Sequence, residues 1–171
     1  AASVGVLEFS DFQCPYCGEF ARIQLPLLLR DYVRSGVVRF WVSQYPLRTI
    51  HPHAAIAAGV ATCAVRDGTF WTLHDWVFAD PNRRLAEGAM ALGRLSRMSP
   101  WKAWLCGHVG SLSNRWIGAD FGRSLGIQIT PTFLIGSIDG DRLRVRAVLE
   151  GLHEYADLIA AVRASTRTGV R

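Results

Sequence analysis

Two cysteines separated by two residues are the side chains of this sequence best suited to chemistry. Cys14 and Cys17 enclose Pro15 and Tyr16, directly after an apolar, β-branched run at residues 4–9. Proline suits the first turn of a helix, so the motif is expected to open a helix that follows a strand. Unpaired amides and the positive dipole end at such a helix start stabilise a thiolate on Cys14. The motif therefore predicts a redox pair in which Cys14 exchanges with a client thiol and Cys17 resolves the mixed disulfide.

Glu8 is a carboxylate inside the first apolar run. Burying it is costly unless it is paired, hydrated or protonated, and burial raises its pKa. Because Glu8 lies six residues before Cys14, the strand could carry it beneath the cysteine pair. There it would exchange the proton that moves when Cys17 attacks or leaves. The alternative is a glutamate at the margin of a sheet that reaches water.

Hydrophobic periodicity predicts the elements that position these residues. Residues 4–9 and 37–42 are strands around a helix that ends near residue 36, and such a unit places both strands parallel. Residues 51–126 keep helical periods and form an all-helical insertion. A hairpin and a final helix follow, with strands at 132–135 and 143–149, a turn at 137–141 and the helix at 155–162.

Thr130-Pro131 stands directly before the strand expected at residues 132–135. Proline has no amide donor and therefore belongs at the start of a strand. Bonds that precede proline are mostly trans, so these two residues alone indicate only where the strand begins.

Composition bounds the class of protein. The chain has 171 residues, of which 50% are hydrophobic and 19% charged, which suits one packed domain and excludes a disordered chain. Its net charge of +5 comes from dispersed arginines with no cluster denser than Arg83-Arg84, so we expect no nucleic-acid partner. The first residues, Ala1-Ala2-Ser3, include no initiator Met, which fits a removed leader or membrane anchor.

A zinc site is the main alternative for the cysteine pair. It would need a second ligand pair at short range, but Cys63 and Cys106 lie far apart in the sequence. A redox pair plus a second, structural pair is the better partition, and we predict no metal site. We expect all histidines at surface positions or helix caps, namely His51, His53, His74, His108 and His153.

Two motifs and the insertion between them resemble the DsbA-like thiol:disulfide oxidoreductases of the thioredoxin superfamily. The motifs are Val-Leu-Glu-Phe-Ser-Asp-Phe-Gln-Cys-Pro-Tyr-Cys at residues 6–17 and Thr-Pro-Thr-Phe at residues 130–133. The resemblance implies an α/β thioredoxin fold with an all-helical insertion between the second and third strands. We expect residues 1–49 and 127–171 to form the thioredoxin core and residues 50–126 the insertion.

The resemblance also implies roles for single residues. Cys14 matches the exposed nucleophile, Cys17 the buried resolving cysteine, and Glu8 the buried acidic residue behind the pair. Pro131 matches a cis-proline that faces the cysteines. The backbone of Thr130 would pair with an extended client segment by strand addition.

Pro15 and Tyr16 are expected to contact the client as well. They replace the Pro-His dipeptide of the family's best-known form, which removes a histidine that could stabilise the thiolate. Cys63 and Cys106 look like the extra, structural disulfide of a subset of the family. Two buried free thiols are the alternative for that pair.

The implied function is a disulfide-forming oxidase that transfers the Cys14–Cys17 disulfide to unfolded or reduced client proteins. This redox-active disulfide is the only redox group expected, without another cofactor. The resemblance further implies reoxidation by a membrane partner linked to quinone. We expect a monomer outside the cytoplasm, in the periplasm or at the outer face of the cell envelope, with an N-terminal membrane anchor as one arrangement.

Two other functions fit the same residues. The first is a thioredoxin-like reductase or a disulfide isomerase on the same scaffold. The second is a non-catalytic module that binds polypeptides or carries a metal and uses the cysteines only as ligands or as a staple.

Overall fold

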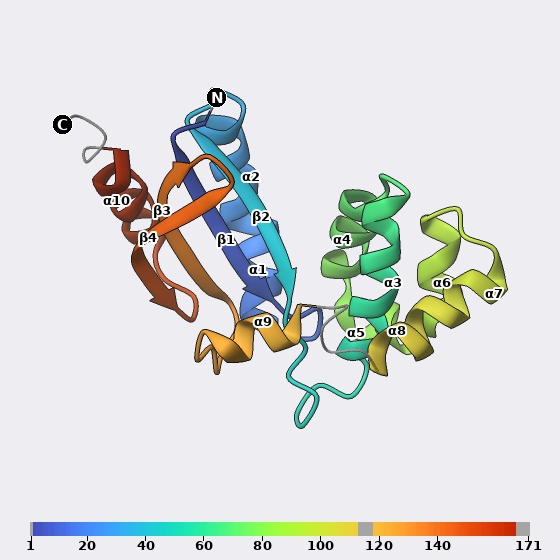
Figure 1. Ribbon diagram of the computed structural model, residues 1–171. Coiled ribbons are helices and arrows are strands. Elements are labelled where there is room, and N and C mark those ends of the chain that lie inside the picture. Colours follow the sequence, from blue (N-terminus) through green and yellow to red (C-terminus); the bar gives the residue numbers. More distant parts are fainter. Residues whose placement is uncertain (1, 113–117, 167–171) are drawn as a thin grey trace.

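A four-stranded sheet forms one side of the molecule and a bundle of helices forms the other (Figure 1). The computed structural model describes residues 2–112 and 118–166. The sheet has the order β2-β1-β3-β4. Its strands are β1 (Val4–Ser10), β2 (Val38–Gln44), β3 (Thr132–Asp139) and β4 (Arg142–Glu150).

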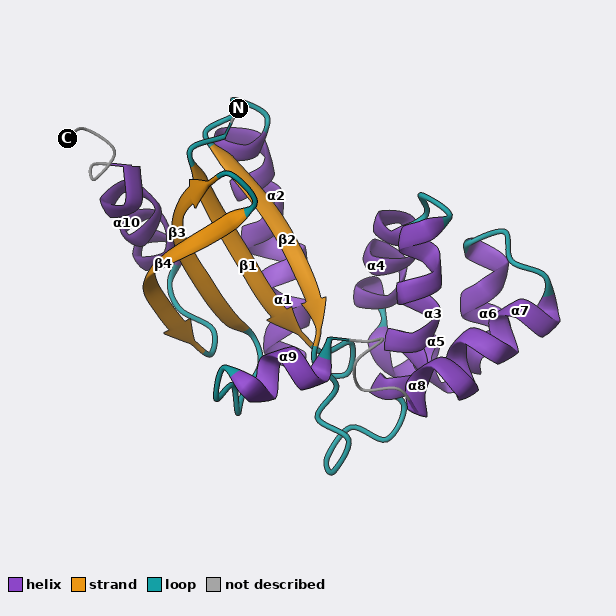
Figure 2. Ribbon diagram, viewed as in Figure 1, coloured by secondary structure: helices purple, strands orange, loops and turns teal. Residues whose placement is uncertain are grey.

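The central strand β1 runs parallel to β2 and antiparallel to β3. Six of its seven residues are buried, as its almost continuous apolar sequence predicts for a strand covered on both faces. Side chains alternate between the two faces, so Glu8 shares a face with Val4 and Val6. That face packs against the helices that follow β1 and against α10 (Tyr155–Thr166), as Figure 2 shows.

One helical segment runs from the cysteine motif to Val33. It consists of α1 (Pro15–Glu19), the π-helical turn η1 (Phe20–Gln24), α2 (Leu25–Leu28) and the π-helical turn η2 (Leu29–Val33). Pro26 lies inside this segment and has no amide hydrogen, so it cannot donate the helical hydrogen bond of its position. The π-helical turn η1 directly precedes α2, the helix that contains Pro26. Phe20, Leu25 and Leu28 bury this segment against the sheet. The expected strand–helix–strand unit is confirmed.

The bundle consists of seven consecutive helical elements. They are α3 (Ala54–Arg66), α4 (Phe70–Ala79), α5 (Pro81–Ala86), α6 (Gly88–Leu95), α7 (Pro100–Trp104), η3 (Leu105–Val109) and α8 (Gly110–Leu112). The helical insertion is thereby confirmed for the described residues, whereas residues 113–117 lie outside them. None of the helices in residues 2–112 and 118–166 is long and apolar enough to cross a membrane.

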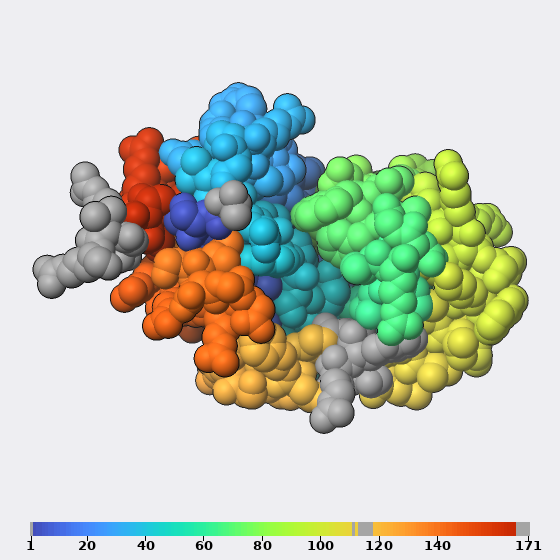
Figure 3. Space-filling model, turned by 45° about the horizontal axis from the view of Figure 1, so that its top comes forward, coloured from blue at the N-terminus to red at the C-terminus, as the bar shows by residue number. Residues whose placement is uncertain are grey.

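The bundle and the sheet unit are in direct contact (Figure 3). Phe12 and Cys17, from the loop and helix after β1, belong to the same buried cluster as Val60 and Phe78 of the bundle. The insertion therefore buries one side of the cysteine motif.

A short helix, α9 (Ala119–Ser124), lies below the sheet and packs on its other face. Ala119 shares a cluster with Phe9 and Tyr45. At Gly122 an added Cβ would lie 2.6 Å from the Tyr45 ring, so only glycine allows this close approach. The division of the chain at residues 49/50 and 126/127 remains a proposal.

The hairpin of β3 and β4 differs from the expectation at one end. The expected strand ended at residue 135 and the turn began at residue 137, but β3 continues to Asp139. Gly136 accounts for the difference, because the pairing shifts register there and an added Cβ would lie 1.9 Å from the Arg144 carbonyl oxygen. A glycine inside a strand marks such a bulge as readily as a turn.

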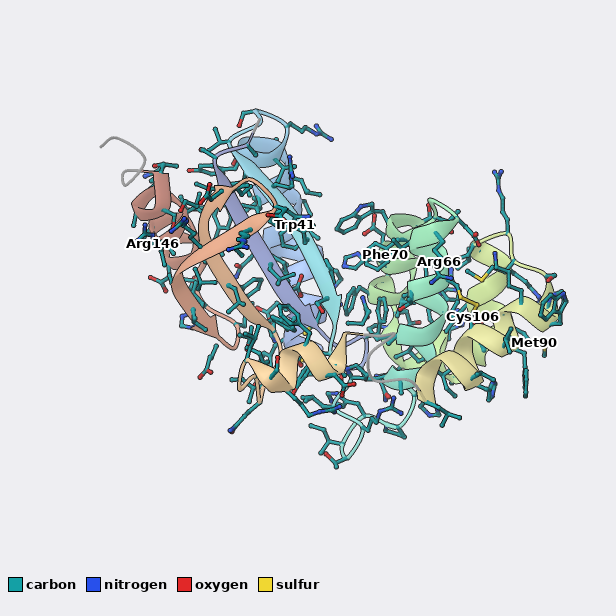
Figure 4. The ribbon with its side chains drawn as sticks, viewed as in Figure 1. Trp41, Arg66, Phe70, Met90, Cys106 and Arg146 are labelled. Carbon is teal, nitrogen blue, oxygen red and sulfur yellow. A yellow bond between two sulfur atoms is a disulfide. The ribbon has the colours of Figure 1, made fainter. Side chains whose placement is uncertain are left out.

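A disulfide joins Cys63 on α3 to Cys106 on η3, with the two Cα atoms 6.2 Å apart. Figure 4 shows it as a yellow bond within the bundle, beside the labelled Cys106. The structure therefore has the bonded pair and not two buried thiols.

Replacing Cys63 and Cys106 by alanine is expected to lower the free energy of unfolding by about 2–4 kcal/mol, because the bond closes a loop of 43 residues in the unfolded chain. Urea denaturation measures the difference. The reference protein and the Cys63→Ala, Cys106→Ala variant both also carry Cys14→Ala and Cys17→Ala, so that thiol exchange cannot rearrange the disulfide. An unchanged free energy would show that the bond adds no stability.

Candidate active site

The cysteine motif lies where β1 ends and the helix begins. Cys14 is the residue that precedes the helix, with an extended backbone (φ −68°, ψ 121°), and Pro15 occupies the first turn. Cys14 and Cys17 are free thiols. Cys17 is fully buried, and Cys14 is almost as buried, with 4% of its surface exposed. The expectation of an exposed nucleophile is therefore wrong in degree, because loops from three parts of the chain close around the Cys14 sulfur.

The two sulfurs have unlike surroundings. A hydrogen bond from the Cys17 thiol is the main influence on Cys14, and with the Thr130 side chain and the amides of Cys17 and Tyr16 it outweighs burial and lowers the pKa of Cys14 to about 6. Burial raises the pKa of Cys17 well above its ordinary value. At neutral pH Cys14 is therefore a thiolate and Cys17 a thiol.

The loop before β3 closes one side of Cys14. The Thr130–Pro131 peptide bond is cis, and both residues are buried. The Cys14 sulfur lies 3.2 Å from the Thr130 carbonyl oxygen. The Thr130 hydroxyl is also buried and has no hydrogen-bond partner within the described ranges, which leaves it free to stabilise a thiolate.

Glu8 lies inside the sheet, paired with Val42 of β2 and Phe133 of β3. It is 1% exposed, so the alternative of a glutamate that reaches water is wrong. Within the described part of the chain neither carboxyl oxygen has a hydrogen-bond partner. Burial raises the pKa of Glu8 to about 8, with the nearby Ser10 side chain acting in the opposite direction. At pH 7 Glu8 therefore holds a proton close to the cysteines.

A groove of about 540 Å³ opens above Cys14. Apolar side chains from three loops form its walls, namely Leu47, Ile50, Ile129 and Leu152. Pro15 and Tyr16 also line the groove, and Tyr16 is 58% exposed. Thr130 also lines the groove, whereas Pro131 is not among the lining residues. The groove can take an apolar polypeptide segment and place it against the Cys14 sulfur.

Two residues at this site were not predicted from the sequence. Asp11 is buried behind the motif, and its carboxylate lies 2.8 Å from Nδ1 of His51, which also lines the groove. The expectation that every histidine lies at a surface or cap is wrong for His74, which is 1% exposed, whereas His51 is partly buried, with its side chain 16% exposed. A signal was available, because parallel β1 and β2 end on the same side of the sheet and their following loops must lie close together.

In the part of the chain that the structure describes, no group of three or more His, Cys, Asp or Glu side chains could hold a metal ion. The redox-active group that the site offers is the cysteine pair itself.

The model of the thioredoxin family matches residues 1–150. Among curated proteins, the Na(+)/H(+) antiporter NhaA 3 of Salinispora tropica is 42% identical over 78 residues, which cover 46% of this chain and 11% of the antiporter. The probable disulfide bond formation protein D of Bacillus cereus is 29% identical over 86 residues, which cover 50% of this chain and 40% of that protein. The chain thus spans less than half the length of these relatives.

Solved structures agree with this family in fold. Wolbachia pipientis α-DsbA1 superposes with a TM-score of 0.79 at 17% identity, over 96% of this chain and 86% of that chain. Oxidised BdbD from Bacillus subtilis gives a TM-score of 0.75 at 19% identity, over 96% and 88%. The chain belongs to the thioredoxin family and has the fold of its DsbA-like members, with a helical insertion between the second and third strands.

Proposed function

We propose that this chain is an extracytoplasmic dithiol–disulfide oxidase that transfers the Cys14–Cys17 disulfide to client proteins. The observation that carries the proposal is the position of the Cys14 sulfur, at the floor of an apolar groove and 3.2 Å from the Thr130 carbonyl. An extended client segment that binds along Thr130 would bring its own sulfur to Cys14. The name of the Bacillus cereus relative, a probable disulfide bond formation protein, supports the same activity.

In the proposed reaction a client thiolate attacks the Cys14 sulfur, and the bond between the two cysteines breaks. Cys17 leaves with the electron pair and takes up a proton. A second client thiolate then attacks the client sulfur of the mixed disulfide and displaces Cys14 as a thiolate, a good leaving group because its pKa is about 6. The client loses two electrons, and the cysteine pair gains them.

Glu8 is the proposed proton donor and acceptor for Cys17. It lies on the sheet face that packs against the helix carrying Cys17, and its charge raises the pKa of that thiol. A carboxyl group that is protonated near pH 7 can give a proton to the leaving Cys17 and take it back when Cys17 attacks.

The proposed partners are reduced or unfolded client proteins and a quinone-linked membrane protein that reoxidises the cysteine pair. The chain would act as a monomer in the periplasm or at the outer face of the cell envelope. The Cys63–Cys106 bond supports an oxidising compartment, because disulfides of this kind rarely persist in a reducing cytosol.

The Cys17→Ser variant is expected to accumulate client adducts at Cys14, because it cannot resolve a mixed disulfide. The client is supplied with its own disulfide bond, which the Cys14 thiolate attacks, displacing one client sulfur as a thiolate. Non-reducing electrophoresis after this incubation would show bands that a reductant removes. The Cys14→Ser variant is the matched control and should form none. A binding module that uses the cysteines only as a staple would form no adducts in either variant and would turn over no dithiol substrate.

The reduction potential of the cysteine pair is expected to lie between about −270 mV and about −120 mV, the values of thioredoxin and of DsbA. The reason is that the pKa of Cys14, about 6, lies between the values of about 7 and about 3.5 for their attacking cysteines. Equilibration with glutathione buffers measures the potential. A value at or below that of thioredoxin would assign the chain to the reductases.

In the reduced state, with Cys14 and Cys17 not bonded to each other, the Glu8→Gln variant is expected to have a free energy of unfolding about 3 kcal/mol above that of the wild type at pH 7. Near pH 4.5 the two proteins should be equally stable. The pKa of Glu8 is raised to about 8 in the folded protein. The folded state thus keeps a proton that the unfolded chain loses, and wild-type stability falls as pH rises between these values. Urea denaturation across this pH range measures the effect.

The same variant should also resolve mixed disulfides at least tenfold more slowly, if Glu8 carries the Cys17 proton. Glu19→Gln, at an exposed position of α1, is the control for both measurements. Equal pH profiles for the wild type and Glu8→Gln would contradict the buried, protonated carboxyl group.

A further inference from the structure

A buried carboxylate ties the loop after β1 to the loop after β2. The Asp11 side chain is inaccessible to solvent and accepts hydrogen bonds from the backbone amides of Gln13 and Leu47, each at 2.7 Å. Its Oδ2 atom also lies 2.8 Å from Nδ1 of His51. The Asp11 amide points to the Cys17 sulfur at 3.5 Å. One residue thus links the cysteine motif to the histidine.

This contact determines which nitrogen of His51 can accept a proton. When the Asp11 carboxylate is ionised it only accepts hydrogen bonds, so in the neutral ring of His51 the hydrogen sits on Nδ1 and Nε2 keeps its lone pair. Nε2 makes no hydrogen bond with any residue that the structure describes. The ring is 16% exposed and lines the same groove as Cys14. His51 therefore presents an oriented base to whatever binds in the groove.

We infer that His51, oriented by Asp11, accepts the proton of the client thiol as that thiol attacks the Cys14 sulfur. The inference rests on the proposed oxidase function and adds a catalytic residue to it. Asp11 acts as the positioning residue, in the way that a carboxylate fixes the tautomer of a catalytic histidine in other enzymes.

The step starts from the oxidised protein. The client S–H bond breaks, its proton passes to Nε2 of His51, and the client sulfur bonds to Cys14. The Cys14–Cys17 bond breaks at the same time, and Cys17 leaves with the electron pair and takes a proton from Glu8. The disulfide is the oxidant, and His51 releases its proton to water before the next attack.

The other titratable groups around the groove do not duplicate this role. The loop after β2 contributes His51, and the motif contributes Cys14 and Tyr16. Cys14 is bonded to Cys17 in the oxidised protein. Tyr16 is an exposed phenol at the rim, and Asp11 is buried behind the ring. The remaining walls of the groove, from the loops before β3 and after β4, supply apolar and hydroxyl groups only.

The size of the effect follows from the chemistry of thiols. A free cysteine has a pKa near 8.5, so only a few per cent of a client thiol is ionised at pH 7. A base that removes the proton during attack can therefore raise the rate by up to about 30-fold at pH 7. The gain disappears near pH 9, where the client thiol ionises without help.

The test compares the wild type with His51→Asn, whose side-chain amide can still donate to Asp11 but has no ring nitrogen. The oxidised proteins react with a reduced apolar peptide that contains one cysteine, and stopped-flow fluorescence follows mixed-disulfide formation from pH 7 to pH 9. His53→Asn is the control, because His53 is exposed on the same loop. The pKa of Cys14 is measured in each reduced protein by thiolate absorbance.

We expect His51→Asn to react about tenfold more slowly at pH 7 and at the wild-type rate near pH 9, with the pKa of Cys14 unchanged. Three results would overturn the inference: equal rates at pH 7, an equal loss at every pH, or a shift in the pKa of Cys14 that accounts for the rate. If the wild type reacts no faster than glutathione disulfide, the proposed function fails instead.

Discussion

The difference in electrostatic environment between two sulfur atoms one helical turn apart is the constraint on which the chemistry depends. At Cys14 the Cys17 thiol and the amides of the helix start favour negative charge, whereas burial opposes it at Cys17. The arrangement requires β1 to end where the helix begins and the Thr130 loop to lie against Cys14. The helical bundle adds the burial of Cys17. The end of β1 and the Thr130 loop thus determine the surroundings of the Cys14 sulfur, and the helical bundle buries the Cys17 sulfur.

Thiol exchange also requires proton transfer. The two groups proposed to carry protons, Glu8 and His51, lie in different parts of the site. Glu8 is buried in the sheet on the side of Cys17. The proposed base, His51, lies in the groove on the side of the client. Both carboxylates at the site are buried, but Glu8 lacks a hydrogen-bond partner among the described residues, whereas Asp11 has three donors. Glu8 is therefore suited to exchange a proton, and Asp11 is suited to orient the His51 ring.

Local patterns are sufficient to predict much of this fold. The apolar run around Glu8 predicts a buried strand and favours a buried carboxyl group over one that reaches water, and the position of Pro15 predicts the helix start. The contact between His51 and Asp11 joins residues 40 positions apart through loops that have no periodicity. The low exposure of Cys14 likewise depends on three loops that meet only in the folded chain. Such features depend on tertiary structure, and the only indication of them is that the loops after parallel β1 and β2 must lie close together.

The outermost strand of the hairpin has a consequence for the proposed reaction with unfolded chains. β4 is the last strand of the sheet, and among residues 2–112 and 118–166 no strand pairs with its outer side, which invites another polypeptide to add to it. Exposed Arg142, Arg144 and Arg146 alternate along it with less polar residues. Their charges and bulk discourage aggregation at this edge. In the proposed function, this arrangement discourages pairing of an unfolded client with the edge of β4 and leaves client pairing to the segment beside Thr130.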